Sequence, residues 1–300
     1  MSPRTTTGAG RSGSTAYRGA SNEAIRHHYD VGDAFYRLWL DPTLTYSCAL
    51  WEAATDSLAD AQRRKLDHLI AAGRAAGTER VLDVGCGWGG LMRRLLGARG
   101  VGHVVGLTLS EAQRRSIAAW AEASAEVRLE NWADHVPSAP YDAIISVEAF
   151  EHFADFGLPR GERVEAYRSF FERCHQWLPR GGRLVIQTGV KGNNVHLDRA
   201  MVSDLLFVVR HVFPESELPW ASEIMEASER RFELVSFRND PADYARTLGE
   251  WLRRLLANRA RAEELLGEER VADYERYLRA AVTAYERGHL GLLRLAFERT

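Results

Sequence analysis

A glycine-rich loop between a short apolar strand and a helix constrains the fold of this chain more than any other feature. Residues 81–84 (VLDV) predict a buried strand, and the segment DVGCGWGG, residues 83–90, runs directly from it into a helix. Gly85 and Gly87 let the backbone approach a ligand closely because glycine has no Cβ. Ligands of open α/β sheets bind beyond the carboxyl ends of the strands, so this loop predicts a cofactor site.

The pattern around the loop predicts an α/β fold. Short apolar strands alternate with helical segments, which is typical of a mostly parallel sheet with helices on its faces. After residue 196 the alternation stops, and we expect an apolar helix at 197–213, a strand at 232–237 and a largely helical segment at 242–300. The strands expected before that point are 81–84, 103–109, 127–130, 141–147 and 183–188.

Composition and helix breakers divide the chain into four parts of a single catalytic domain. Residues 1–20 are rich in Gly, Ser, Thr and Arg, and they predict a disordered tail, with a basic arm as the alternative. Residues 21–75 predict a helical lid that is interrupted at Asp41-Pro42. Residues 76–196 form the cofactor-binding core, and residues 197–300 supply an acceptor-pocket cap, the last strands and C-terminal helices.

Charge and cysteine content narrow the class of protein. The formal charge of −2 excludes a globally basic nucleic-acid binder. The three cysteines lack CxxC spacing, so we expect neither a disulfide framework nor a metal site. No apolar run reaches about 18 residues and no signal segment is visible. We therefore expect a cytoplasmic enzyme with at most peripheral membrane contact, and homo-oligomer formation stays open.

The loop serves either a dinucleotide or S-adenosylmethionine (SAM). A dinucleotide fingerprint has the spacing GxGxxG and an acidic residue about 20 positions later. Here the spacing is GxGxG, and residues 105–110 (VGLTLS) contain no acid. Thr108 and Gln113 offer hydrogen bonds to a ribose or a methionine end instead. A nicotinamide enzyme is therefore disfavoured.

Several short segments between residue 25 and the C-terminus then carry a family resemblance. They are HYDVG at 28–32, LDP at 40–42, YSCA at 46–49, VLDVGCGWG at 81–89, GLTLS at 106–110, FEHF at 150–153, VFP at 212–214 and DYARTL at 243–248. Together they resemble the SAM-dependent cyclopropane fatty acid synthases, particularly the mycolic-acid cyclopropane synthases and methyltransferases. The resemblance implies a class I Rossmann-like methyltransferase with a seven-stranded, mostly parallel sheet and helical lids.

The same resemblance implies a set of SAM contacts. Trp132 matches an aromatic residue beside the adenine, and its usual acidic neighbour is Ala133 here, a departure expected to weaken adenine recognition. The implied contacts are Tyr29, Tyr46 and Ser47 from the lid, Asp83, Gly85 and Gly87 from the loop, Thr108 and Gln113 on the ribose side, and Trp132.

The resemblance also implies a catalytic set. Cyclopropane synthases methylate an alkene, and a bound bicarbonate is thought to remove the proton that lets the ring close. The positions that hold it correspond to Cys48, Glu151, Gln187 and Tyr244. Gln187 stands in place of a histidine and cannot carry a positive charge, which counts against a bicarbonate site here.

Glu148 is a second departure, since the cyclopropane enzymes have glycine at that position. The segment from Glu148 to His152 instead resembles small-molecule N-methyltransferases that carry Glu-x-x-Glu-His. Two carboxylates and an imidazole can deprotonate an amine, or stabilise a cation and take its proton. We expect Glu151 to be the catalytic base, assisted by Glu148, His152, Tyr244 and Cys48.

The expected activity is methyl transfer from SAM to an alkene carbon or an amine of a hydrophobic small molecule or lipid. Helix 197–213 is expected to line the acceptor pocket, with Gln187, Phe207 and Arg210 in contact with the substrate. Two alternatives stay open: a cyclopropane synthase acting on unsaturated acyl chains, and a SAM-binding protein without turnover.

Overall fold

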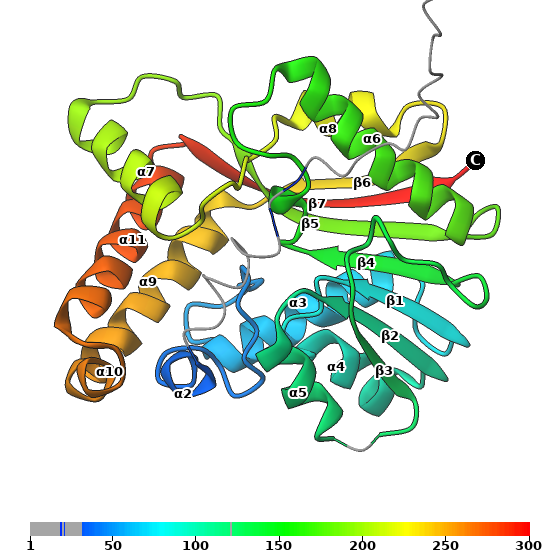
Figure 1. Cartoon of the computed structure of the whole chain (residues 1–300), viewed down its shortest axis with the longest axis horizontal. Coiled ribbons are helices and arrows are strands. Elements are labelled where there is room, and N and C mark those ends of the chain that lie inside the picture. The colour runs from blue at the N-terminus through cyan, green and yellow to red at the C-terminus, as the bar shows by residue number, and fades with distance from the viewer. Residues whose placement is uncertain (1–18, 20, 22–31, 121) are drawn as a thin grey trace, which may run out of the picture.

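The computed structural model of the chain describes residues 19, 21, 32–120 and 122–300 (Figure 1). The seven strands in these residues form one sheet with the order β3-β2-β1-β4-β5-β7-β6. Strands β1 to β5 pair in parallel, and β6 runs in the same direction, while β7 between β5 and β6 runs antiparallel to both. The strands are β1 (Arg80–Val84), β2 (His103–Thr108), β3 (Ala125–Leu129), β4 (Ala143–Val147), β5 (Arg183–Lys191), β6 (Phe232–Asn239) and β7 (Leu290–Arg299). The predicted mostly parallel α/β sheet is therefore confirmed.

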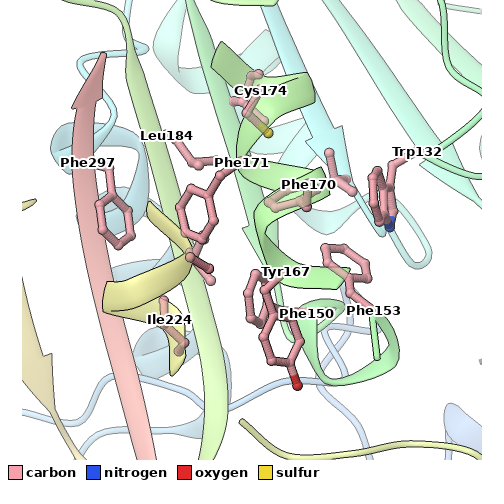
Figure 2. Close-up of a cluster of buried hydrophobic side chains, with 14 of the residues drawn as sticks. Trp132, Phe150, Phe153, Tyr167, Phe170, Phe171, Cys174, Leu184, Ile224 and Phe297 are labelled. Carbon is pink, nitrogen blue, oxygen red and sulfur yellow. The ribbon is translucent and has the colours of Figure 1, made fainter. Parts of the chain in front are cut away.

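Helices cover both faces of this sheet. On one face, α6 (Arg160–Trp177) and α8 (Ala221–Ser228) bury an aromatic cluster that includes Phe150, Phe170 and Phe171 (Figure 2). Burial of each such side chain contributes about 1.5–3 kcal/mol. The other face packs against α3 (Leu58–Ala72), α4 (Gly90–Arg99) and α5 (Glu111–Ala118).

A separate helical cap lies beyond the carboxyl ends of the strands (Figure 1). It buries its own core, in which Trp39 packs against Trp251 at a ring-centroid distance of 5.7 Å, so segments more than 200 residues apart in the sequence meet there. The predicted helix at 197–213 is confirmed as α7, which Asp198 caps. The elements of the cap are α2 (Asp33–Tyr36), α7 (Arg199–His211), α9 (Pro241–Ala257), α10 (Arg259–Leu266) and α11 (Glu268–Glu286).

Local signals explain where two of the core elements begin. Ser110 accepts a hydrogen bond from the Gln113 backbone N–H, so it is the N-cap of α5. Gly85 has a φ of 82°, and a Cβ there would lie 2.4 Å from the Cβ of Ala149, so the turn after β1 requires glycine.

The expectation that residues 242–300 are largely helical was wrong at the end of the chain. The helices stop at Glu286, and Leu290–Arg299 forms β7 inside the sheet. A strand that is buried on both faces has a continuous apolar sequence, which periodicity alone does not distinguish from a buried helix. The domain boundaries stay predictions, and the expected tail lies almost wholly outside the described residues. Within the described part of the chain, no helix is both long and apolar enough to cross a membrane.

Candidate active site

The glycine loop forms one wall of a cavity at the carboxyl ends of the parallel strands. Eight of the nine expected SAM contacts line this cavity, and the ninth, Tyr29, lies outside the described residues. Gly87 has a φ of 54°, and the space that its Cβ would enter is open. The eight are Tyr46, Ser47, Asp83, Gly85, Gly87, Thr108, Gln113 and Trp132.

Polar groups in this cavity are complementary to the functional groups of SAM. Asp83 is buried, its Oδ2 has no hydrogen-bond partner, and burial raises its pKa to about 7. An ammonium group such as that of the methionine moiety would satisfy this carboxylate. Thr108 Oγ1 donates to Gln113 Oε1 at 2.6 Å, so the two expected ribose-side residues are held together.

Lys65 is a part of this cavity to which sequence reasoning gave no role. Its fully buried ammonium donates to Ser47 Oγ at 2.7 Å, and burial lowers its pKa to about 8. A buried cation without a directly bonded carboxylate suits the carboxylate end of SAM. Glu130 and Asn131 also line the cavity, and their position just after a strand was the signal that could have identified them. The residues present therefore fit SAM.

A second, mostly apolar cavity adjoins the first. Helix α7 lines it with Leu205, Val208 and Val209, and the cap adds further apolar and tyrosine side chains. Tyr46, Glu148 and His152 line both cavities. These three residues therefore mark the place where the two cavities meet.

Two expected substrate contacts on α7 do not line this cavity, and their role in substrate binding stays a prediction. The Phe207 ring packs against the guanidinium of Arg276, which lies 4.1 Å from its centroid, and Arg210 is exposed. The helical period turns Leu205, Val208 and Val209 toward the cavity, so the residues between them face elsewhere. The apolar composition of the helix identified the element but not its orientation.

The Glu148 carboxylate binds three of the residues expected to hold bicarbonate. The Cys48 backbone N–H donates to Glu148 Oε1 at 2.8 Å, and Gln187 Nε2 donates to the same oxygen at 2.8 Å. The Tyr244 hydroxyl donates to Oε2. Cys48 and Gln187 are fully buried and line neither cavity, so the structure does not bring Gln187, an expected substrate contact, to a cavity wall. Burial raises the pKa of the Cys48 thiol, which leaves its backbone as the functional group.

Glu151 is also buried at this junction. Its Oε1 accepts a hydrogen bond from the Gly189 backbone N–H at 2.5 Å, and its Oε2 is buried without a partner. Burial and the neighbouring Glu148 raise the pKa of Glu151 to about 8, so it is protonated at neutral pH. Burial lowers the pKa of His152 to about 4, so its imidazole is neutral, and Nδ1 lies 2.7 Å from Ser216 Oγ.

Arg294 stands behind these residues and was missed by sequence reasoning. Its Nε donates to Gln187 Oε1 at 2.9 Å, and its guanidinium pairs with Asp240. It lies on β7, in the segment that was expected to be helical, so nothing placed it near the strand ends. Among the described residues no group of three or more His, Cys, Asp or Glu side chains is arranged to hold a metal ion.

Comparisons with known proteins identify the family. The family model described as mycolic acid cyclopropane synthetase matches residues 17–295. The chain belongs to this family. A relative in the mycolic acid cyclopropane synthetase family, cyclopropane mycolic acid synthase 3 of Mycobacterium tuberculosis, is 32% identical over 92% of this chain and 96% of its own length.

Solved structures support the same assignment. The cyclopropane synthase MmaA2 from Mycobacterium tuberculosis superposes with a TM-score of 0.86 at 30% identity, covering 93% of this chain and 99% of its own. The mycolic acid cyclopropane synthase CmaA1, complexed with S-adenosylhomocysteine (SAH) and CTAB, has a TM-score of 0.84 at 30% identity and the same coverage. This member of the mycolic acid cyclopropane synthetase family is a SAM-dependent methyltransferase.

Proposed function

We propose that the enzyme methylates an alkene carbon of a long acyl chain and that loss of a proton then closes a cyclopropane ring. The observation that carries this proposal is the meeting of the two cavities at Tyr46, Glu148 and His152. A methyl group presented from the cofactor cavity at this junction would face a chain lying in the apolar cavity. Membership of the family and the acyl acceptors named for its relatives support an alkene as the acceptor.

The lining of the second cavity suits a neutral chain. No Lys or Arg occurs among the described residues that line it. Its polar groups gather at the junction, while Leu205, Val209 and Leu218 provide apolar surface. A site of this composition gains free energy from burying methylene groups, at about 0.8 kcal/mol for each.

The chemistry follows from the groups at the junction. When bound, SAM supplies a methyl group that is already activated as part of a sulfonium. The protein aligns the alkene with it and excludes water. The alkene π electrons form the new C–C bond, which leaves a carbocation on the adjacent carbon. Glu148 and the faces of Tyr244 and Tyr285 can stabilise that cation. Removal of a proton from the added methyl lets its C–H electrons close the ring.

An amine acceptor is the second candidate, because Glu148 and Glu151 place two carboxyl groups at the junction. Coclaurine N-methyltransferase shares the fold at 21% identity, which supports the fold alone. An amine would be methylated through its lone pair and would need only a base.

The test supplies methyl-¹³C-labelled SAM together with a panel of monounsaturated acyl chains. Matched saturated chains serve as controls, and hydrophobic amines form a parallel panel. We expect label in the unsaturated chains only, with the upfield proton resonances of a cyclopropane. A methyl resonance on an olefinic carbon would support methylation of the alkene and contradict ring closure. Labelled amines with unlabelled alkenes would establish the second candidate, and SAM binding without turnover on either panel would favour a non-catalytic role.

The setting of the reaction is also a proposal. The enzyme is proposed to act in the cytoplasm, where SAM is made, and to contact a membrane at most peripherally. Cell fractionation tests the location. Light scattering of the purified chain tests whether it forms a homo-oligomer.

A further inference from the structure

We propose that Glu148 is the proton acceptor of this reaction, a carboxylate that the chain itself carries in place of an external anion. The inference rests on the proposed function, since it names the base for that same junction. Glu148 then takes the role of base that was expected from the sequence for Glu151. With Glu148 as the base, the enzyme does not require bicarbonate.

The hydrogen bonds around Glu148 form an anion-binding cage that its own side chain fills. Three donors from three separate segments converge on it, namely the Cys48 backbone N–H, Gln187 Nε2 and the Tyr244 hydroxyl. Such hydrogen bonds favour the ionised form of a carboxylate. The buried ammonium of Lys65 acts in the same direction, opposing the burial that raises the Glu148 pKa. An external anion would need these same donors, and they are already occupied.

The backbone at Glu148 is in a conformation that favours glycine. Its φ is 53°, in the left-handed region, which costs roughly 1–2 kcal/mol for a residue with a Cβ. Burying a carboxylate adds a second cost. Strained residues of this kind are held in place by their surroundings and cluster at functional sites. Here the surroundings are the three donors, which fix the carboxylate at the meeting point of the two cavities.

The two carboxyl groups at the junction divide their roles. Glu151 has one backbone donor and a pKa of about 8, so it holds a proton at neutral pH and cannot accept another. Glu148 has three donors, which favour its ionised form against the burial that raises its pKa. Because Glu148 lines both cavities, its carboxylate can reach a methyl group that has just been transferred from one to the other.

The proton can be followed through the step. The carbocation loses a proton from the added methyl to a Glu148 oxygen, the C–H electron pair forms the last ring bond, and the carboxylate becomes a carboxylic acid. Overall the acceptor gains CH₂, SAM becomes SAH, and one proton leaves Glu148 for solvent when the products depart. No further reactant is required.

The experiment removes the side chain and supplies an anion. Glu148→Gly relieves the left-handed backbone and empties the cage, so this variant should fold, whereas Glu148→Gln keeps the cage filled with an uncharged group. Arg230→Gly is the matched control, because Arg230 is exposed and also left-handed, with a φ of 64°. Turnover is measured in CO₂-depleted buffer with increasing concentrations of formate or bicarbonate. The substrate is the acyl chain that the ¹³C-labelling experiment identifies.

We expect the wild type and Arg230→Gly to be unaffected by either anion. Both Glu148 variants should lose about 10²–10⁴ in kcat, the usual contribution of a general base. Formate or bicarbonate should restore Glu148→Gly at least tenfold, with saturation, and should not restore Glu148→Gln. Loss of wild-type turnover on CO₂ depletion, or activity of both Glu148 variants equal to that of the wild type, would overturn the proposal.

A binding measurement separates this proposal from the proposed function. We expect bicarbonate or formate to raise the melting temperature of the SAH complex of Glu148→Gly and not that of the wild type. If this stabilisation is seen but no acyl chain is turned over, the proposed acceptor is wrong, while the proposal that Glu148 fills the anion-binding cage stands. If acyl chains are turned over but the wild type depends on bicarbonate, the proposed function stands and the proposal for Glu148 is wrong.

Discussion

Arg294 and Gln187 lie directly opposite each other on the antiparallel strands β7 and β5, and Arg294 Nε donates to Gln187 Oε1 at 2.9 Å. This bond determines which way the Gln187 amide is turned. Because its oxygen faces Arg294, its NH₂ group faces the Glu148 carboxylate. Strand β7, the last strand in the sequence, thus orients the Gln187 amide, a hydrogen-bond donor of the site that lies on the neighbouring strand β5.

Removing the Gln187 donor should make Glu148 harder to ionise. For Gln187→Met we expect the ascending limb of the pH–rate profile to move to higher pH, because losing a hydrogen bond to a carboxylate raises its pKa. Gln187→His keeps a donor, so its profile should move less, and it should not create bicarbonate dependence because Glu148 still fills the cage. An unshifted profile in Gln187→Met would show that Gln187 does not position the base.

Cofactor binding should depend on pH through Asp83. Its pKa of about 7 in the free protein means that the carboxyl is neutral below pH 7 and ionised above it. Affinity for SAH, whose ammonium needs the ionised form, should therefore increase as the pH is raised from 6 to 7.5. Asp83→Asn should lower affinity about 10–100-fold, since a hydrogen bond to a charged group contributes about 1.5–3 kcal/mol. Calorimetric titration tests both, and a pH-dependent affinity that persists in Asp83→Asn would exclude this cause.

Glu151 should contribute to stability in a pH-dependent way. Its pKa is raised to about 8 in the folded protein, so between about pH 4.5 and 8 the folded state holds a proton that the unfolded state has lost. Its contribution to stability is therefore greatest at low pH and is lost as the pH rises. Glu151→Gln should gain stability relative to wild type over this range, as denaturant unfolding at several pH values would show. Its kcat should stay within about tenfold of wild type, and a loss as large as that of Glu148→Gln would return the base role to Glu151.

The acceptor cavity should be adjustable from α7. Val209 lines it, so Val209→Phe should fill part of it and lower kcat/KM for long chains by about tenfold or more, consistent with the 1–3 kcal/mol cost of overpacking. Val202 on the same helix is 39% exposed, which makes Val202→Phe the matched control with unchanged kinetics. SAM affinity should be unchanged in both variants. Equal effects of the two substitutions would show that the chain binds elsewhere.

The parts of the site that could be predicted from the sequence are those whose residues lie close together in the chain. The cofactor loop was predictable because a strand, a turn and a helix start fall within ten residues, with Asp83, Gly85 and Gly87 at fixed spacing. The cage around Glu148 was not, because its donors come from residues 48, 187 and 244 and meet only through the sheet and cap. The role of Arg294 could not be predicted because it requires β7 to be a strand, and the apolar sequence of β7 also suits a helix. The position of Phe207 could not be predicted because it depends on how α7 is rotated against α11.

A crystal structure with SAH and a long-chain acyl analogue is the measurement that tests the account most directly. We expect the SAH sulfur to face the junction of Tyr46, Glu148 and His152, with the acyl chain in the apolar cavity and the Glu148 carboxylate between the Cys48, Gln187 and Tyr244 donors. A sulfur directed away from that junction, or a separate anion bound to those donors with Glu148 displaced, would contradict the account.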